Sequence, residues 1–151
     1  MKKRDIIHAV LEHLREDFER RQIAAKRTRQ QGNDAESKAE GKYDTRATEE
    51  NYLADGLARQ ALVAAKAAEA IEKMPVREFG PHEDIDLGAL VEVKFPKETE
   101  FFLLAPSGGG TEILWEGKTI VVLTPESPLG LQLMGRHLDN KVGQAKIQAI
   151  F

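Results

Sequence analysis

The sequence predicts an α+β protein, in which an antiparallel α-helical coiled-coil hairpin precedes a small antiparallel sheet with one short helix. Apolar residues recur at three- and four-residue steps before residue 75, and they alternate with polar residues after residue 85. Between these halves, residues 76–84 combine glycine, proline and charged residues, a composition typical of a linker. We therefore expect a hairpin over residues 1–75, a linker over 76–84 and a compact domain over 85–151.

Each of the two helices is indicated by its own pattern. The first runs from Asp5 to about Gln31, and Gly32 is predicted to end it. The second begins at Thr45 or Thr48 and ends before Pro75; its alanine-rich part favours close antiparallel packing. At 1.5 Å per residue, such a hairpin is ~40 Å long. The apolar stripe of the first helix consists of Ile6, Ile7, Val10, Leu11, Leu14 and Phe18.

The second half reads as short strands with one helix. Strands are predicted over residues 90–95, 100–105, 111–116, 118–123 and 144–151. The segment Ser107-Gly108-Gly109-Gly110 is interpreted as a hairpin turn, because it lacks the lysine and the serine or threonine of a phosphate-binding loop. Pro125 introduces a turn and a short helix that reaches Met134.

Composition limits the kinds of function that are open to the chain. It has 151 residues and no cysteine, which excludes disulfides and thiolate metal sites. No stretch approaches the roughly 18 apolar residues of a membrane span, so we expect a cytoplasmic protein without membrane contact. The net charge of −3 is unevenly distributed. Residues 1–75 hold 15 basic and 14 acidic side chains, and residues 76–151 hold the remaining 7 basic and 11 acidic ones. The high density of both signs in the first half is expected for solvated helices.

Three acidic residues lie where the chain enters the second helix: Asp44, Glu49 and Glu50. They can serve the helix itself, since Asp44 can cap it and early glutamates suit the positive end of its dipole. Alternatively, carboxylates at the end of a hairpin can be delivered to a distant metal site. Their oxygens suit Mg²⁺, which takes one or two carboxylates and otherwise keeps its waters.

A basic run lies on the distal part of the first helix. It is either a solvated helix face or a surface that attracts a nucleic-acid backbone in a salt-dependent way. No aromatic residue interrupts it, so base stacking is not indicated. The run consists of Arg20, Arg21, Lys26, Arg27 and Arg29.

These features together resemble the Gre-type bacterial transcript-cleavage factors. Ser127-Pro128-Leu129 and Leu133-Met134-Gly135-Arg136 resemble the family's serine–proline turn and its closing glycine-basic motif. Glu40-Gly41 and Glu50-Asn51-Tyr52 resemble the family's hairpin tip. The resemblance implies an FKBP-like C-terminal domain that docks on RNA polymerase through Ser127, Pro128, Leu129, Gly135 and Arg136.

The resemblance also implies a function. Family members bind bacterial RNA polymerase at its secondary channel, and their tip acids hold a Mg²⁺ with which the polymerase cuts backtracked RNA. Asp44 matches the tip aspartate, and Glu49 or Glu50 matches the glutamate. The chain would then be a monomeric accessory factor, not an enzyme, that meets nascent RNA transiently through its basic run. It would bind no cofactor tightly, and would share Mg²⁺ with the polymerase.

One departure from the family keeps other functions open. The family places its two tip acids three residues apart, whereas Asp44 and Glu49 are five apart and Thr48 stands where the second acid would fall. The chain could therefore regulate polymerase by occupying the channel without cleavage. A prolyl isomerase or chaperone is less favoured, because such a pocket is lined by aromatic residues and the second half is poor in tyrosine and has one tryptophan. A coiled-coil adaptor with an unrelated partner is the fourth possibility.

Overall fold

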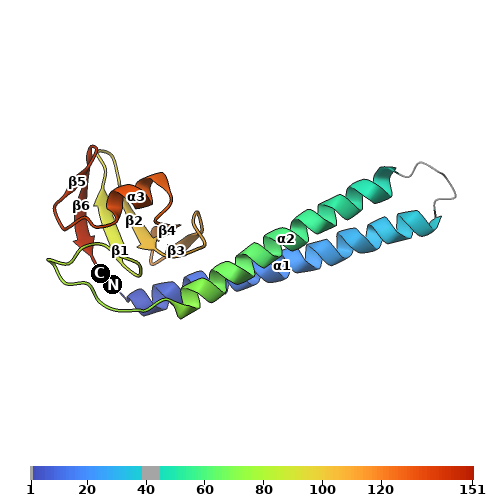
Figure 1. Cartoon of the computed structure of the whole chain (residues 1–151), viewed down its shortest axis with the longest axis horizontal. Helices are drawn as coiled ribbons and strands as arrows, with labels where there is room; N and C mark the ends of the chain where they lie inside the picture. The colour runs from blue at the N-terminus through green and yellow to red at the C-terminus, as the bar shows by residue number, and fades with distance from the viewer. Residues whose placement is uncertain (1, 39–44) are drawn as a thin grey trace. The chain divides into compact units, whose positions relative to one another are not determined.

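The computed structural model describes residues 2–38 and 45–151 (Figure 1), and the side chains of residues 2–34 and 48–151. It confirms the α+β class: two long helices are followed by a sheet and one short helix. In chain order the elements are α1 (Lys3–Lys38), α2 (Thr45–Lys73), β1 (Leu90–Lys94), β2 (Thr99–Leu104), β3 (Glu112–Trp115), β4 (Lys118–Leu123), α3 (Pro128–Leu133), β5 (Lys141–Val142) and β6 (Ala145–Ile150).

The chain divides into two compact units. Unit 1 comprises Met1–His13 together with Ala67–Phe151, and unit 2 comprises Leu14–Lys66. Unit 1 therefore contains the sheet and α3 as well as the beginning of α1 and the end of α2. The domain boundaries expected from the sequence at residues 75 and 85 stay a prediction.

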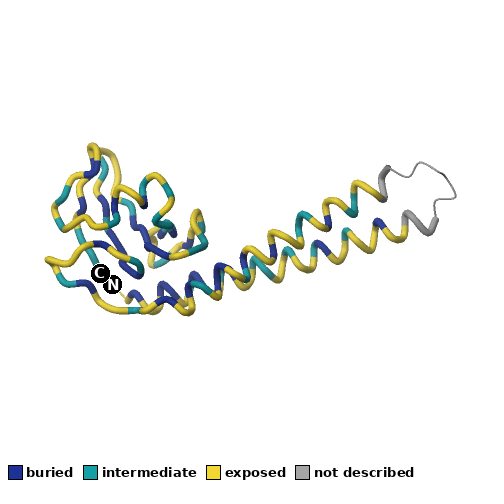
Figure 2. Tube along the Cα trace, in the orientation of Figure 1, coloured by how far each residue is buried: buried dark blue, intermediate teal, exposed yellow. Residues whose placement is uncertain are grey.

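Unit 2 is an antiparallel pair of helical segments. Arg21 on α1 donates to the Gln60 side chain on α2, and Arg29 pairs with Asp55, so residues later on α1 meet residues earlier on α2. Buried positions recur along both segments (Figure 2). Apart from Leu14, the buried apolar side chains among the described residues of this unit are small, which lets the two backbones approach closely. They are Ala25, Ala54, Ala61 and Ala64.

The prediction that α1 ends at Gly32 is wrong, because the helix continues to Lys38. Gly32 is buried and lies seven residues, close to two turns, after the buried Ala25. It therefore continues the stripe of small residues on one helix face. A glycine inside a helix costs about 1 kcal/mol relative to alanine, an amount that packing can offset.

The sheet of unit 1 has the order β3-β4-β2-β1-β6-β5. It is mixed, so the expected purely antiparallel sheet is wrong at one pair: β2 and β4 run parallel, with Phe101 opposite Ile120. Consequently, the segment from Ser107 to Gly110 is not a hairpin turn. It connects β2 to β3, which are not neighbours in the sheet. β4 follows β3 in the chain and lies between β3 and β2.

The turn between β3 and β4 explains that return. Glu116 and Gly117 have φ values of 47° and 77°, and they connect the paired residues Trp115 and Lys118. Positive φ at both central residues is the signature of the tight hairpin whose twist matches that of the flanking strands. β3 and β4 thus form a local antiparallel hairpin, and β4 pairs with β2 along its other edge.

The sheet is buried on both faces. Val91, Val93 and Phe102 belong to a core cluster with Leu133 of α3, while Leu90 and Leu103, which point the other way, are also fully buried. Strands buried on both faces read as continuous apolar runs, which accounts for the sequence from Phe101 to Leu104 in β2. Among the described residues, no helix has the length and apolar character needed to span a membrane.

Candidate functional site

The predicted metal site falls partly outside the part of the chain that the structure describes. Glu40, Gly41 and Asp44 lie outside the described residues. Glu49 is exposed and Glu50 is half-buried, both near the beginning of α2. Because consecutive helical residues point about 100° apart, these two glutamates do not face the same direction. The described residues contain no group of three or more histidine, aspartate or glutamate side chains that could hold a metal ion.

The basic run does not form a single patch. Arg21 and Arg29 flank the seam between the helices, where they contact Gln60 and Asp55 of α2. Arg21 also pairs with Asp17, at 3.0 Å. These two guanidinium groups are therefore engaged in holding unit 2 together.

The other three cations of the run point away from that seam. Arg20 and Arg27 lie seven residues apart and so share one helix face, and Lys26 is adjacent to Arg27. All three are exposed, although Arg20 also lies 3.4 Å from Asp17. Ile23, whose side chain is 51% exposed, lies between Arg20 and Arg27 on the same face. The surface available to a polyanion is thus Arg20, Lys26 and Arg27.

The Ser127–Leu129 segment begins α3. The Ser127 hydroxyl accepts a hydrogen bond from the Gly130 backbone N–H at 3.0 Å and donates to the Thr124 backbone oxygen at 2.8 Å. Pro128 occupies the first turn, where its missing N–H leaves no hydrogen bond unmade. Leu129 packs against the core cluster. These three predicted docking residues therefore build the helix.

The two remaining predicted docking residues lie just after α3. Gly135 has a φ of 77°, and its N–H donates to the Ile85 backbone oxygen at 2.8 Å. The Arg136 side chain is exposed, with its Nε 3.1 Å from the Gln132 backbone oxygen. Of the five predicted docking residues, Arg136 is the one whose charge is presented to solvent.

Sequence reasoning missed Leu131, whose side chain is 67% exposed on α3. A signal for it was present. Leu129 and Leu133 are four residues apart and share the buried face, which leaves the leucine between them to point outward. Leu131 is thus an exposed apolar residue on α3, and Arg136 is an exposed charged residue just after it.

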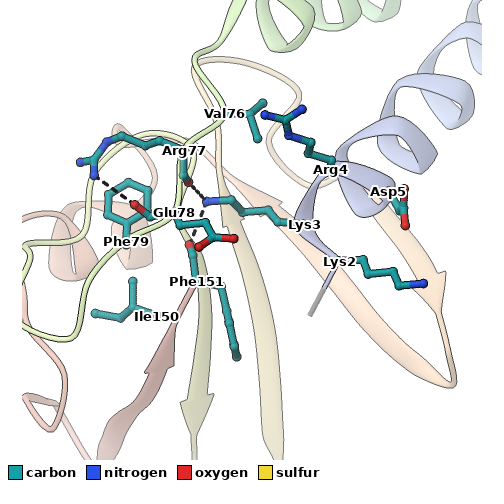
Figure 3. Close-up of a pocket in the computed structure, with 10 residues that line it drawn as sticks. All are labelled: Lys2, Lys3, Arg4, Asp5, Val76, Arg77, Glu78, Phe79, Ile150 and Phe151. Atoms are coloured by element: carbon teal, nitrogen blue, oxygen red, sulfur yellow. Dashed lines mark hydrogen bonds between the residues drawn. The ribbon is translucent and has the colours of Figure 1, made fainter.

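Unit 1 also contains a cavity of about 720 Å³, lined by the beginning of α1, residues 76–79 and the end of β6 (Figure 3). The Lys3 side chain is buried there. Its ammonium donates to the Arg77 backbone oxygen and, at 3.0 Å, to that of Phe151, and it lies 4.9 Å from the Phe79 ring centroid. Burial is the main factor that lowers the pKa of Lys3; Arg77 lowers it further, whereas Glu78 raises it. The sequence did not single out Lys3, whose hydrogen bonds connect the beginning of α1 to residue 77 and to the C-terminal residue within unit 1.

No family model matches the chain, and no curated protein matches it. Solved structures similar to it include the transcription factor Gfh1, at 18% identity and a TM-score of 0.35, covering 94% of this chain and 93% of the other. GreA factor homolog 1 of Thermus thermophilus matches at 18% identity and a TM-score of 0.33, covering 95% of each chain. Gfh1 of Thermus aquaticus matches at 19% identity and a TM-score of 0.33, covering 88% and 92%. At these identities and TM-scores, the roles of residues rest on this chain's own side chains.

Proposed function

We propose that this protein is a Gre-like transcription elongation factor that binds bacterial RNA polymerase at the secondary channel. The observation that carries the proposal is the pairing of two long helices, of 36 and 29 residues, ahead of an α+β domain with a serine–proline-capped α3. At 1.5 Å per residue α1 alone is about 54 Å long. A helix of this length can carry side chains far from its own first residue.

The domain would dock through the exposed end of α3. Leu131 offers an apolar contact and Arg136 a cation, while Ser127, Pro128, Leu129 and Gly135 hold these two in position. Substituting Arg136 with glutamate should therefore weaken polymerase binding without unfolding the protein. Substituting Ser127 should act indirectly, by loosening the start of α3.

The hairpin would supply carboxylates to the polymerase active site. Asp44, with Glu49 or Glu50, provides the hard oxygen ligands that Mg²⁺ prefers, and the exposure of Glu49 fits that role. Mg²⁺ bound by these carboxylates would supply an activated water for phosphodiester hydrolysis. The polymerase performs the reaction, and this chain acts as a cytoplasmic, monomeric accessory factor. Arg20, Lys26 and Arg27 would attract the RNA backbone.

A second function is favoured by the position of Thr48. This residue is exposed near the beginning of α2, at the place of the second tip acid in the Gre pattern. Asp44 and Glu49 are then five residues apart instead of three. A protein with this spacing could occupy the channel and regulate polymerase without supporting cleavage.

One experiment separates the two functions. The protein is incubated in Mg²⁺ buffer with a backtracked elongation complex whose RNA is end-labelled, alongside a variant carrying Asp44→Ala, Glu49→Ala and Glu50→Ala. The matched control is Glu19→Ala, which removes an exposed glutamate from α1. Cleavage that is lost only in the triple variant supports the cleavage factor.

The remaining outcomes are equally informative. Absence of cleavage, together with displacement of a known secondary-channel binder, supports regulation by occupancy. Cleavage that persists in the triple variant contradicts metal delivery by these acids. Neither cleavage nor displacement contradicts the Gre-like function altogether.

A further inference from the structure

Within unit 2, one face of α2 is turned away from α1. Tyr52 on this face is 72% exposed, whereas the buried Ala61 lies on the opposite side, because nine residues at 100° each make two and a half turns. The residues that share the side of Tyr52 follow at steps of four and three, the spacing that keeps side chains on one face of a helix. We call the five together the outer face of α2; the other four are Gly56, Arg59, Val63 and Lys66.

Three residues of the outer face form a donor row, in which each residue lies seven positions, close to two turns, from the next. They are Tyr52, Arg59 and Lys66, and all three are exposed. Within the described part of the chain, none of these side chains makes a hydrogen bond or an ion pair. Asp55, one turn before Arg59, pairs instead with Arg29 of α1. The donor row therefore presents a phenol, a guanidinium and an ammonium group without acceptors.

The positions between the donors form a small row, Gly56 and Val63, which also lie seven residues apart. Val63 is 67% exposed. Gly56 lies inside α2, where glycine is disfavoured relative to alanine. Beyond the helix backbone, a Cβ built on Gly56 would meet one described atom within 4 Å, a guanidinium nitrogen of Arg59 at 3.9 Å. Nothing in the described chain thus requires a glycine here, and its lack of a side chain opens the α2 backbone to close approach from outside.

The two rows define what a partner must offer. Residues at alternating steps of three and four are the pattern by which one helix packs along another. Carboxylates are the acceptors that match the charge of Arg59 and Lys66, and the phenol of Tyr52 can donate to a carboxylate as well. Large apolar side chains fit against the small row, because ridges of one helix pack into the grooves of the next. The matching surface is a helix with an acidic row beside a large apolar row.

We propose that the outer face of α2 docks a helix of a partner protein, in whose contact face acidic and large apolar residues alternate at steps of three and four. Its carboxylates meet the donor row, and its apolar side chains cover Gly56 and Val63. The outer face is separate from the α3 residues that are proposed to dock on polymerase, and the inference does not rest on that function.

Two other occupants fit the outer face less well. Two copies of this chain packed through it would bring Arg59 and Lys66 of each into one interface, to which the face itself contributes no carboxylate; juxtaposed like charges oppose association. Single-stranded RNA would meet the cations and stack a base on Tyr52. The small row gives RNA neither a donor nor a stacking platform, whereas a helix uses it for close packing.

The test uses the full chain and fluorescein-labelled helical peptides of about three heptads, blocked at both ends. Glutamate and leucine each recur every seventh residue, and alanine, glutamine and lysine fill the outer positions. In one peptide leucine follows glutamate by four residues and in the other by three, which suits a parallel and an antiparallel partner. Matched peptides carry lysine in place of each of these glutamates, and a scrambled peptide keeps the composition without the repeat. Fluorescence anisotropy measures binding.

Two protein variants locate the binding site. Arg59→Glu with Lys66→Glu reverses the charge of the donor row at two exposed positions. Gly56→Leu fills the small row with a residue that favours the helix. The control is Ile23→Glu, which alters an exposed apolar residue on the side of α1 that points away from α2.

We expect one of the glutamate peptides to bind the original protein at least about tenfold more tightly than its lysine counterpart or the scrambled peptide. The charge reversal should weaken this binding by about tenfold or more, and should make the lysine counterpart the tighter ligand. Gly56→Leu should also weaken it by about tenfold, and the control should leave it unchanged. Far-UV circular dichroism establishes that each variant is folded, and the charge reversal decides the matter if Gly56→Leu is not.

The contrary outcomes are distinct. Equal binding of the scrambled peptide overturns the helical contact face. Equal binding of the glutamate peptide to the charge-reversed protein overturns the role of the donor row and with it the proposal. Absence of binding by both glutamate peptides overturns the proposal as well, and binding of a labelled oligouridine in their place, lost on charge reversal, assigns the outer face to RNA instead.

Discussion

A Cβ atom built on Gly130 would lie 1.9 Å from the backbone oxygen of Thr124. The chain closes back on itself here, because the Ser127 hydroxyl bonds both the Thr124 oxygen and the Gly130 N–H. The start of α3 is therefore packed against the turn that precedes it, with room for a hydrogen atom but not for a methyl group. The serine–proline turn that resembles the Gre-type pattern lies in this segment. The tight packing between Thr124 and Gly130 explains why a glycine stands at position 130.

Replacing Gly130 with alanine should destabilise unit 1 by about 3 kcal/mol, the upper range for overpacking, because the obstructing atom belongs to the backbone and cannot rotate away. Trp115, the single tryptophan of the chain, reports unfolding of this unit in denaturant. An unchanged midpoint would show that α3 can shift without cost.

The same substitution at Gly56 should have the opposite effect. Gly56 lies inside α2, and the nearest atom to a Cβ built there is a guanidinium nitrogen of Arg59, at 3.9 Å. Alanine is favoured over glycine in a helix interior by about 0.5–1 kcal/mol. We expect a stabilised unit 2, measured by circular dichroism at the helical band, and a loss of stability here would mean that Gly56 has a packing role.

Ser127→Ala should cost about 1 kcal/mol of stability, the usual effect of losing a helix N-cap. Ser127→Thr keeps a hydroxyl that can both accept from Gly130 and donate to Thr124, and should remain within a few tenths of a kcal/mol of the original protein. If both variants lose polymerase binding while only the alanine variant loses stability, Ser127 contacts the partner directly.

Lys3→Met should change how stability depends on alkaline pH. The pKa of Lys3 is lowered in the folded protein, from 10.5, chiefly by burial. Folding therefore favours the neutral amine, and the protein gains stability as pH rises from the lowered pKa toward 10.5. Methionine does not titrate. Denaturant titrations at several pH values across this window should therefore show the free energy of unfolding of the original protein rising relative to that of the variant. Parallel curves would mean that the hydrogen bonds to Arg77 and Phe151 offset the effect of burial.

Glu100→Gln should stabilise the protein near neutral pH. The pKa of Glu100 is raised from 4.5 by burial, then by Glu98 and Glu112, so its charged form is disfavoured by folding. The original protein therefore gains stability as pH falls through the raised pKa toward 4.5, and the advantage of the variant should narrow over that range. Thermal unfolding at a series of pH values measures the difference. A constant difference would trace the effect to packing instead of charge.

Much of the fold could be predicted from local pattern. The strand from Lys118 to Leu123 has the predicted bounds, since its apolar residues lie between clear turn signals. The parallel pairing of β2 with β4 could not be predicted, because it joins residues separated by a whole hairpin and leaves no periodic signal in either strand. The continuation of α1 through Gly32 depended on packing against a second helix, which outweighed the local helix-breaking tendency.

The candidate sites were predictable as residue types but not as arrangements. The five cations of the basic run are visible in the sequence, yet the ion pair of Arg29 with Asp55 becomes apparent only once the two helices are paired. Lys3 resembles any solvated lysine near the start of a chain. Its burial follows from the meeting of α1, residues 76–79 and β6, which are far apart in the sequence.

The two stretches of chain that form unit 1 are separated by the whole of unit 2, and this order has a consequence during synthesis. The residues of unit 2 leave the ribosome early, and their helices can pair as soon as both have emerged, because their contacts are local. Unit 1 cannot finish folding until the last residues have been synthesised, because β1 pairs with β6 and Lys3 donates a hydrogen bond to the backbone oxygen of Phe151. A ribosome paused before β6 would therefore carry finished helices beside an unfinished sheet, which is the form that chaperones and proteases would meet.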